Sequence, residues 1–371
     1  MSGHNLSPLH RLSALGQSVW VDFLSRESIR GGHLQGLLDG DAVVGATSNP
    51  TIFQKAMSAG DAYDEQIREL AEEGLDARAS FWRLAERDIK DACDLFRPIW
   101  EGGVGRDGYV SLEVAPDLAY DTLATYEEAM RLHETVDRAN LMVKIPATKP
   151  SLGAIEDVIA KGRSINVTLI FSLRRYAEVA ESYVRGLERL IAAGGDPRGV
   201  ASVASFFVSR IDTEGDRRLE ELGGHENLKG RLAVANAKLA YQHYRSFFRG
   251  PRWEFLAGKG ATPQRVLWAS TSTKNPAYPD TLYVEELIGP DTINTMPEET
   301  IRAYQDHGRP QGRLQTGVTE AHKLLRELER AGVDYEDLTD TLEGEGVQKF
   351  SDSFEELIAA LGEKQAALAV A

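Results

Sequence analysis

Lys144 is the residue of this sequence whose setting best suits covalent chemistry. It lies in the apolar run Leu141–Pro146, where Leu141, Val143 and Ile145 form one alternating set. A lysine in solution has a pKa of about 10.4, so roughly one in 2,500 is neutral at pH 7. Burial lowers that pKa, because a low dielectric disfavours the ammonium ion. A buried Lys144 would therefore be a nucleophile able to form a Schiff base with a ketone.

Two carboxylates occupy similar places in other apolar runs, Asp22 in Val19–Phe23 and Glu113 in Tyr109–Val114. Formation and dehydration of a carbinolamine need an acid and a base in turn, which Glu113, Thr168 and a bridging water would supply. Cleavage of a carbon–carbon bond needs a base on the substrate hydroxyl, and Asp22 is free for that role. A nearby carboxylate stabilises the ammonium form of Lys144 and so opposes the neutral amine. We therefore expect one of three arrangements. Either the effect of burial on the amine outweighs that of the carboxylates, or one carboxyl is protonated, or a water separates both carboxyl groups from the amine.

Further polar residues would hold a phosphorylated polyol. Asn49 and Asn166 are candidates for its hydroxyl groups. Arg210 is one candidate for the phosphate, and the segment Ser270-Thr271-Ser272-Thr273-Lys274 offers hydroxyls, backbone N–H groups and an ammonium group. Such a Ser/Thr-rich segment alone is more often only a turn. Together with Arg210, it predicts an anion site.

These residues belong to short apolar runs that alternate with amphipathic stretches, the pattern of a (β/α)8 barrel. The predicted strands are Val19–Phe23, Ala42–Ser48, Tyr109–Val114, Leu141–Pro146, Ile165–Ile170, Val200–Val208, Arg265–Ala269 and Asp291–Met296. The predicted helices include Ser80–Trp100, Thr122–Arg138, Leu152–Lys161, Arg174–Ala193 and Gly230–Phe248. A doubly wound open sheet is the main alternative. No Gly-x-Gly-x-x-Gly follows the first strand, which argues against its nucleotide-binding version.

We expect one α/β domain over residues 1–371, a TIM barrel with additional helices. Residues 1–18 would be an N-terminal extension, and residues 332–371 one or two C-terminal helices. The apolar positions at helical spacing in this tail are Phe350, Phe354, Leu357 and Leu361. Two connections are long: residues 51–108 have room for two or three helices, and residues 213–264 have no role that we can assign.

Strand parity directs the candidate residues to one side. In a closed barrel, alternate residues face the surrounding helices and must be apolar, so the polar set faces inward. That set lies late in the strands, toward the C-terminal mouth where barrel active sites form. It comprises Asp22, Thr47 with Asn49, Ser111 with Glu113, Met142 with Lys144, and Asn166 with Thr168. Each residue alone has an ordinary explanation, such as a helix cap, a turn or a lysine that extends its amine to solvent. The agreement between five strands predicts a site.

The charge balance narrows the range of partners. Of 371 residues, 42 are basic and 57 acidic, which gives a formal charge of −15. Such a surface repels nucleic acids and anionic membranes, so we expect neither as a partner, although a small basic pocket for an anionic substrate stays open.

The single cysteine, Cys93, excludes a disulfide framework and a multi-cysteine metal site. No apolar run approaches the ~20 residues of a membrane span, and Met1–Ala14 lacks the apolar segment of a signal peptide. We expect a reduced, cytoplasmic protein.

Four motifs, in this order, resemble those of the transaldolase family, in its bacterial branch with longer chains. They are Ala46-Thr47-Ser48-Asn49-Pro50-Thr51, Ser111-Leu112-Glu113-Val114, Val143-Lys144-Ile145-Pro146-Ala147-Thr148 and Ser164-Ile165-Asn166-Val167-Thr168-Leu169-Ile170-Phe171-Ser172. Each motif alone is weakly or moderately specific, whereas the combination is highly specific. The resemblance runs from about Val19 to the C-terminal helices. It implies an (α/β)8 barrel with neither a metal nor an organic cofactor.

The resemblance also implies a reaction and a role for each site residue. The reaction is the reversible transfer of a dihydroxyacetone unit between sedoheptulose 7-phosphate and glyceraldehyde 3-phosphate, which yields erythrose 4-phosphate and fructose 6-phosphate in the non-oxidative pentose phosphate pathway. By this likeness Lys144 forms the Schiff base, and Asp22 is the acid and base at the cleaved bond. Glu113 and Thr168 would handle the catalytic water. The substrate would be positioned by Thr47, Asn49, Asn166 and Ser205, with Phe207 bordering the pocket and Arg210 on the phosphate.

The chain departs from the family pattern around the phosphate. Many relatives carry Arg where this chain has Lys274, so a point charge replaces a bidentate fork. The serine that partners Lys274 is either Ser270 or Ser272, because this segment is longer than in those relatives. Phosphate sites of barrels more often follow strands seven and eight, so a site after strands six and seven is a mild departure.

Two other functions stay open. One is a Schiff-base lyase similar to fructose-6-phosphate aldolase, which releases free dihydroxyacetone. In that branch a tyrosine is among the groups that hold the catalytic water, so Glu113 favours transfer. The other is a barrel that binds sugar phosphates without catalysis. Monomer and homodimer are both compatible with the sequence.

Overall fold

Within the described residues, 7–58 and 60–370, eight parallel strands close into a barrel in the order of the chain. The structure is a computed structural model. The strands are β1 (Gln17–Val21), β2 (Val43–Ala46), β3 (Val110–Glu113), β4 (Leu141–Pro146), β5 (Ile165–Ile170), β6 (Ser202–Phe207), β7 (Arg265–Ala269) and β8 (Thr292–Met296). Because β1 pairs with both β2 and β8, the ring has no free edge. The predicted (β/α)8 barrel is confirmed, and the open sheet is excluded.

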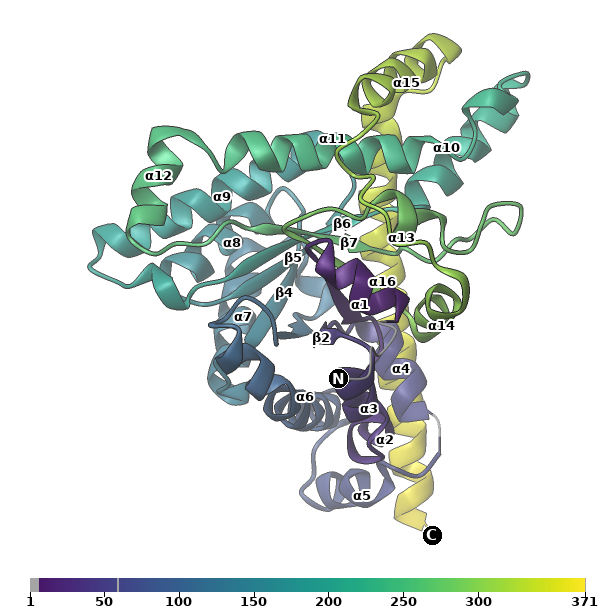
Figure 1. The fold of residues 1–371 in the computed structure, drawn as a ribbon. Helices are drawn as coiled ribbons and strands as arrows, with labels where there is room; N and C mark the ends of the chain where they lie inside the picture. Colours follow the sequence, from purple (N-terminus) through teal and green to yellow (C-terminus); the bar gives the residue numbers. More distant parts are fainter. Residues whose placement is uncertain (1–6, 59, 371) are drawn as a thin grey trace, which may run out of the picture.

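Helices surround the barrel and fill the long connections (Figure 1). They are α1 (Pro8–Ala14), α2 (Arg26–Arg30), α3 (His33–Gly40), α4 (Pro50–Ser58), α5 (Asp64–Glu72), α6 (Ala77–Gly102), α7 (Thr122–Val136), α8 (Ser151–Ala160), α9 (Leu173–Ala192), α10 (Ser209–Leu222), α11 (Leu232–Phe247), α12 (Gly250–Gly258), α13 (Leu282–Glu286), α14 (Glu298–His307), α15 (Val318–Ala331) and α16 (Tyr335–Val370), with short 3-10 turns η1 (Pro116–Leu118), η2 (Pro197–Gly199) and η3 (Glu226–Leu228). The connection 51–108 thus contains α4, α5 and α6. The tail is one continuous helix rather than two.

The strands form where apolar residues are buried on both faces, as parallel strands surrounded by helices require. Two strands differ from the expected pattern. β1 begins at Gln17 and ends at Val21, so Asp22 follows the strand, and its N–H donates to Met296 O at 2.8 Å. In β5 the alternation is interrupted at Leu169, whose φ of 59° lies in the left-handed region and coincides with a register shift against β6. Both irregularities lie at the C-terminal mouth.

The N-terminal end of the barrel is closed by a buried polar cluster. Arg265 is paired with Asp107 at 3.1 Å and donates to Ser18 Oγ at 2.6 Å and to Thr292 O at 2.9 Å. Asp107 also accepts from Trp20 Nε1 at 3.1 Å. Since Arg265 and Thr292 begin β7 and β8, this cluster ties three strands and the chain before β3 together, at the end opposite the mouth.

The segment before the barrel contributes α1 to the fold. Residues 1–6 of the expected N-terminal extension lie outside the described residues. Helix α1 packs beside β1 and α14 and buries Leu9 and Leu12, while Gln17 and Ser18 already belong to β1. In the described part of the chain, no helix is both long and apolar enough to span a membrane.

Helix α16 lies along the barrel and reaches its mouth. In Figure 1 it is the long yellow helix that passes beside α4, and it also contacts α5, α6, α10 and β5. Its buried apolar positions include the predicted set Phe350, Phe354, Leu357 and Leu361. At Gly346 the helix approaches β5 so closely that an added Cβ would lie 3.0 Å from Leu169 Cδ2.

Candidate active site

A cavity of about 340 Å³ opens at the C-terminal mouth, where the strands deliver most of the predicted residues. It is lined by Asp22, Thr47, Asn49, Lys144, Thr168, Ser205, Phe207, Arg210, Ser270, Ser272 and Lys274. Glu113 and Asn166 lie in the layer below, in contact with lining residues. Strand parity therefore brings together residues that are far apart in the chain.

Lys144 stands at the centre of this arrangement and is only 4 % exposed. Its Nζ donates to Ser48 O at 3.2 Å, lies 3.3 Å from Glu113 Oε2, and stands 5.7 Å from the centre of the Phe350 ring. For Glu113, this contact excludes the expected arrangement in which a water separates the two groups. Burial raises the pKa of Glu113, and the charge of Lys144 only partly opposes that effect. The carboxyl of Glu113 therefore holds a proton more readily than an exposed glutamate does, even though it contacts the amine of Lys144.

Asp22 directly follows β1 and lines the same cavity as Lys144. Its Oδ1 accepts from Thr47 Oγ1 at 2.7 Å, and Thr47 Oγ1 is also 2.7 Å from Thr295 Oγ1. Burial raises the pKa of Asp22, while the charge of Lys144 and the hydrogen bond from Thr47 act in the opposite direction. Burial therefore sets the direction of the pKa shift of Asp22, and Lys144, Thr47 and Lys274 limit it.

Polar side chains of β3, β5 and β6 hold one another in place below the cavity. Asn166 donates to Ser111 Oγ at 3.1 Å and accepts from Ser205 Oγ at 2.7 Å. Thr168 Oγ1 and Glu113 Oε2 are both buried, and neither has a hydrogen-bond partner with proper geometry within the described chain. Two such atoms are suited to hold a water between them, because a buried water needs several polar partners.

Asn49 has two roles in the structure. Its Oδ1 accepts from the N–H of Ile52 at 3.0 Å, so it caps the start of α4, while the residue also lines the cavity. The ordinary explanation, a helix entry at Asn49-Pro50, is confirmed, and it is compatible with the place of Asn49 in the cavity lining.

The cationic wall combines the chain after β6 with the segment after β7. Arg210 Cζ stands 5.5 Å from the centre of the Phe207 ring, and Lys274 Nζ donates to Ser272 Oγ at 2.6 Å. Ser272 is thus the serine that partners Lys274. Ser270 instead lies 2.9 Å from the hydroxyl of Ser209, with a left-handed φ of 55°. Burial lowers the pKa of Lys274 and of Arg210.

Several lining residues were not predicted: Thr51, Ile52, Lys55, Ala269, Thr295, Pro297, Glu299, Lys349 and Phe350. Thr295 could have been found, because it is a polar residue late in a predicted strand. Phe350 was predicted only as part of an apolar helix face. Lys55, Glu299 and Lys349 come from helices, where strand parity gives no signal. Within the described residues, no group of three or more His, Cys, Asp or Glu residues is arranged to hold a metal ion.

Fold and site together define a class: parallel (β/α)8 barrels with a buried amine at the floor of a polar, cationic mouth. The model of the Transaldolase/Fructose-6-phosphate aldolase family matches residues 19–361, and the chain belongs to this family. It is 52% identical over 360 residues to a transaldolase of Parafrankia sp., with 96% of this chain and 98% of the relative covered. It is 51% identical over 356 residues to a transaldolase of Acidothermus cellulolyticus, with 95% and 96% covered. Transaldolase 1 of Streptomyces coelicolor is 50% identical over 356 residues, with 95% and 93% covered.

Proposed function

We propose that this protein is a transaldolase, which moves a dihydroxyacetone unit from a ketose phosphate to an aldose phosphate. The observation that carries the proposal is the buried amine of Lys144, in contact with Glu113 and on the floor of a cavity that Asp22 also lines. Relatives named transaldolase, about half identical over nearly the whole chain, support the same reaction. The donor and acceptor pairs are those of the family: sedoheptulose 7-phosphate with glyceraldehyde 3-phosphate, and fructose 6-phosphate with erythrose 4-phosphate.

The first half of the mechanism forms the Schiff base. The amine of Lys144 attacks the C2 carbonyl of the ketose and gives a carbinolamine. A water between Glu113 and Thr168 carries a proton from the carboxyl to the carbinolamine hydroxyl, which leaves as water and yields the iminium ion. The raised pKa of Glu113 suits this step, because the carboxyl must hold the proton before it is needed.

The second half breaks and remakes a carbon–carbon bond. Ionised Asp22 removes the proton of the C4 hydroxyl, the C3–C4 bond breaks, and its electron pair moves to the iminium ion to give an enamine. The aldose leaves, with its new carbonyl formed from that hydroxyl. The enamine carbon then attacks the carbonyl of the acceptor aldose while Asp22 returns the proton. Addition of water to the new iminium ion releases the product ketose and the free amine of Lys144.

The remaining residues would bind the substrate. Thr47, Asn49 and Ser205, which line the cavity, would form hydrogen bonds with sugar hydroxyls, and Phe207 would border the substrate. Asn166 would do so from the layer below, where it accepts from Ser205. Arg210, Ser272 and Lys274 offer a guanidinium group, a hydroxyl and an ammonium group to the phosphate. The whole chain carries a formal charge of −15. Cations gathered at the mouth of so acidic a protein therefore support an anionic substrate.

The test is reductive trapping combined with turnover. The protein is incubated with fructose 6-phosphate and borohydride, and the adduct is located by mass spectrometry. We expect an adduct on Lys144, none in Lys144→Ala, and continued turnover only when erythrose 4-phosphate is present. Release of free dihydroxyacetone without an acceptor would instead identify the fructose-6-phosphate aldolase-like lyase. Binding without an adduct would identify a non-catalytic sugar-phosphate barrel.

One structural observation favours transfer over release. Among the described residues that line the cavity there is no tyrosine, and the group beside the amine is Glu113. The cytoplasmic location, the absence of a cofactor, and a monomeric or homodimeric state stay predictions. Light scattering of the purified protein would measure its oligomeric state.

A further inference from the structure

Helix α16 brings two side chains into the cavity, Lys349 and Phe350. The ring of Phe350 is buried above Lys144. Lys349 is exposed at the rim, and within the described chain it forms no ion pair. An exposed lysine without a carboxylate partner, at the edge of a cavity that holds Arg210 and Lys274, is available to an anionic ligand.

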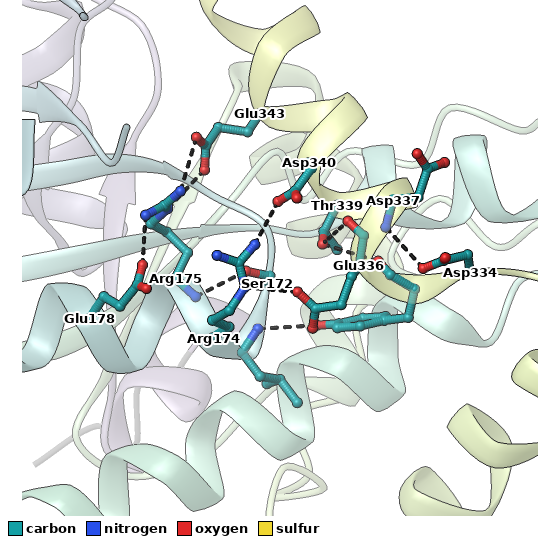
Figure 2. Close-up of polar contacts among 12 residues, drawn as sticks. Ser172, Arg174, Arg175, Glu178, Asp334, Glu336, Asp337, Thr339, Asp340 and Glu343 are labelled. Carbon is teal, nitrogen blue, oxygen red and sulfur yellow. Dashed lines mark hydrogen bonds and ion pairs between the residues drawn. The ribbon is translucent and has the colours of Figure 1, made fainter. Parts of the chain in front are cut away.

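The position of Lys349 over the mouth is fixed from both sides. Before it, Figure 2 shows Arg175 of α9 in contact with Glu343 of α16, at 2.9 Å between Nε and Oε2. This ion pair is largely buried, since Arg175 is 5% exposed. After it, Thr51 Oγ1 of α4 donates to Ser353 Oγ at 2.9 Å. A helix anchored on both sides of a residue holds its backbone in place, so only the lysine side chain has to adjust to a ligand.

The charged groups around Lys274 do not by themselves balance the charge of a bound phosphate. Burial lowers the pKa of Lys274, Glu299 raises it, and the nearby charges of Arg210 and Lys349 lower it further. The carboxylate of Glu345 raises the pKa of Arg210 and so opposes the effect of burial on it. A phosphate monoester carries about −1.5 to −2 charges at pH 7. Arg210 and Lys274 supply two positive charges, and Glu299, which lines the same cavity, cancels one of them. A further cation would balance the dianion, and two exposed lysines line the cavity, Lys55 of α4 and Lys349 of α16. Lys349 is the nearer candidate, because its charge acts on Lys274 and Lys55 is not among the groups that do so.

We infer that Lys349 is a phosphate-binding residue, which α16 presents to the same phosphate group as Arg210 and Lys274. The inference rests on the proposed function and deepens it, because it names the residue that completes the charge balance of the bound sugar phosphate. Lys349 would therefore raise the preference for phosphorylated over unphosphorylated sugars. It does not touch the reacting carbon atoms, so its loss leaves the chemistry at Lys144 in place.

The experiment compares Lys349→Met with Lys349→Arg and with Lys364→Met. Lys364 lies on the same helix and pairs with Asp64 at 2.7 Å, outside the cavity, so its variant controls for a general weakening of α16. Three quantities are measured for each full-length protein: the Kd of inorganic phosphate by calorimetry, KM and kcat for fructose 6-phosphate with erythrose 4-phosphate, and the yield of borohydride trapping with dihydroxyacetone.

We expect Lys349→Met to raise the Kd of phosphate and KM about tenfold, the effect of one lost charge-assisted contact. Trapping with dihydroxyacetone, which has no phosphate, should stay at the level of the unaltered protein. Lys349→Arg should restore most of the affinity, and Lys364→Met should change none of the three quantities. Unchanged Kd and KM in Lys349→Met would overturn the inference, as would an equal loss of trapping with dihydroxyacetone. Failure of the unaltered protein to trap any ketose would refute the proposed function, while the phosphate Kd values would still decide the role of Lys349.

Discussion

Asp22 and Glu113 have their pKa values raised by the same cause, burial, but have opposite tasks in the proposed mechanism. Glu113 benefits from the shift, because it has to hold a proton. Asp22 has to be ionised, and the hydrogen bond from Thr47 and the charge of Lys144 limit its shift. Two acids with different neighbours can therefore be divided between acid and base roles within one cavity.

The pH dependence of catalysis follows from Asp22. Because its pKa is raised, activity should fall on the acidic side at a pH above the ordinary value of about 3.9. Thr47→Val removes a hydrogen bond that lowers this pKa, so the acidic limb should move to still higher pH. The measurement is kcat/KM against pH for both proteins with the same substrates, which cancels the titration of the substrate phosphate. A limb that stays in place, or moves to lower pH, would contradict the role of Asp22.

Glu113→Gln tests the proton transfer at the amine. Glutamine keeps the shape of the carboxyl but cannot exchange a proton, so Schiff-base formation should slow by about 10²–10⁴-fold. The rate is measured by rapid mixing with fructose 6-phosphate followed by a borohydride quench. Binding of inorganic phosphate serves as the control and should not change. A normal rate of trapping would remove Glu113 from the mechanism.

The sequence predicted that polar residues of several strands meet at one cavity, for a physical reason. A polar residue such as Asn166 or Lys144 within an apolar strand has to face inward, and parallel strands bring their ends to one mouth. Lys55, Glu299 and Lys349 lie on helices, where an exposed charged residue is the normal case. Their approach to the mouth depends on the packing of whole helices, which no local pattern records.

Helix α16 is predictable as a helix but not in its placement. Its apolar spacing indicates an amphipathic helix, and the structure extends it over 36 residues, from the Arg174 and Arg175 contacts of α9 to α5. The close approach at Gly346 decides where it lies, because a side chain there would meet Leu169 of β5. The segment 213–264, also without an assigned role, completes α10 and supplies α11 and α12 around the barrel.

Two glycines of α16 provide a matched test of this placement. A Cβ at Gly344 would meet nothing within 4 Å, whereas one at Gly346 would meet Leu169 Cδ2 at 3.0 Å. Gly344→Ala should stabilise the protein by about 0.5–1 kcal/mol, because alanine favours the helix. Gly346→Ala should show a smaller gain or a loss, together with a higher KM, since it pushes Lys349 outward. Urea denaturation and steady-state kinetics measure both effects, and identical behaviour of the two variants would contradict the close approach.

At the scale of the whole molecule, stability and chemistry occupy opposite ends of the barrel. The mouth carries the polar cavity with Lys144 and the cations Arg210 and Lys274. The other end carries the buried cluster around Arg265 and Asp107. The closed ring itself was predictable from the alternation of strands and helices, but this cluster was not, because its members are separated widely in the sequence.

The variant Asp107→Asn tests whether the Arg265–Asp107 cluster contributes to stability without affecting activity at the mouth. The change leaves the buried Arg265 without a charged partner, which should lower the free energy of unfolding by about 3 kcal/mol. Asp291→Asn is the matched control, since Asp291 pairs with Arg106 at 2.9 Å on the surface, with both side chains 53% exposed, and should cost at most about 1 kcal/mol. Urea denaturation gives the stabilities. At low temperature kcat and KM should be unchanged in both variants; a loss of activity without a loss of stability in Asp107→Asn would contradict this division.

The 36 residues of α16 follow the last strand of the barrel in the chain, so they are synthesised after it. From the end of β8 at Met296 to Phe350 the chain has 350 − 296 = 54 residues, which take roughly 3–11 s at translation rates of about 5–20 residues per second. During that interval the nascent protein has its reactive lysine but lacks the aromatic ring and the cation that α16 places over it. Premature termination of translation before this point would release a barrel whose cavity lacks Lys349 and Phe350. We therefore expect a truncated protein to have a cavity that is more open to solvent.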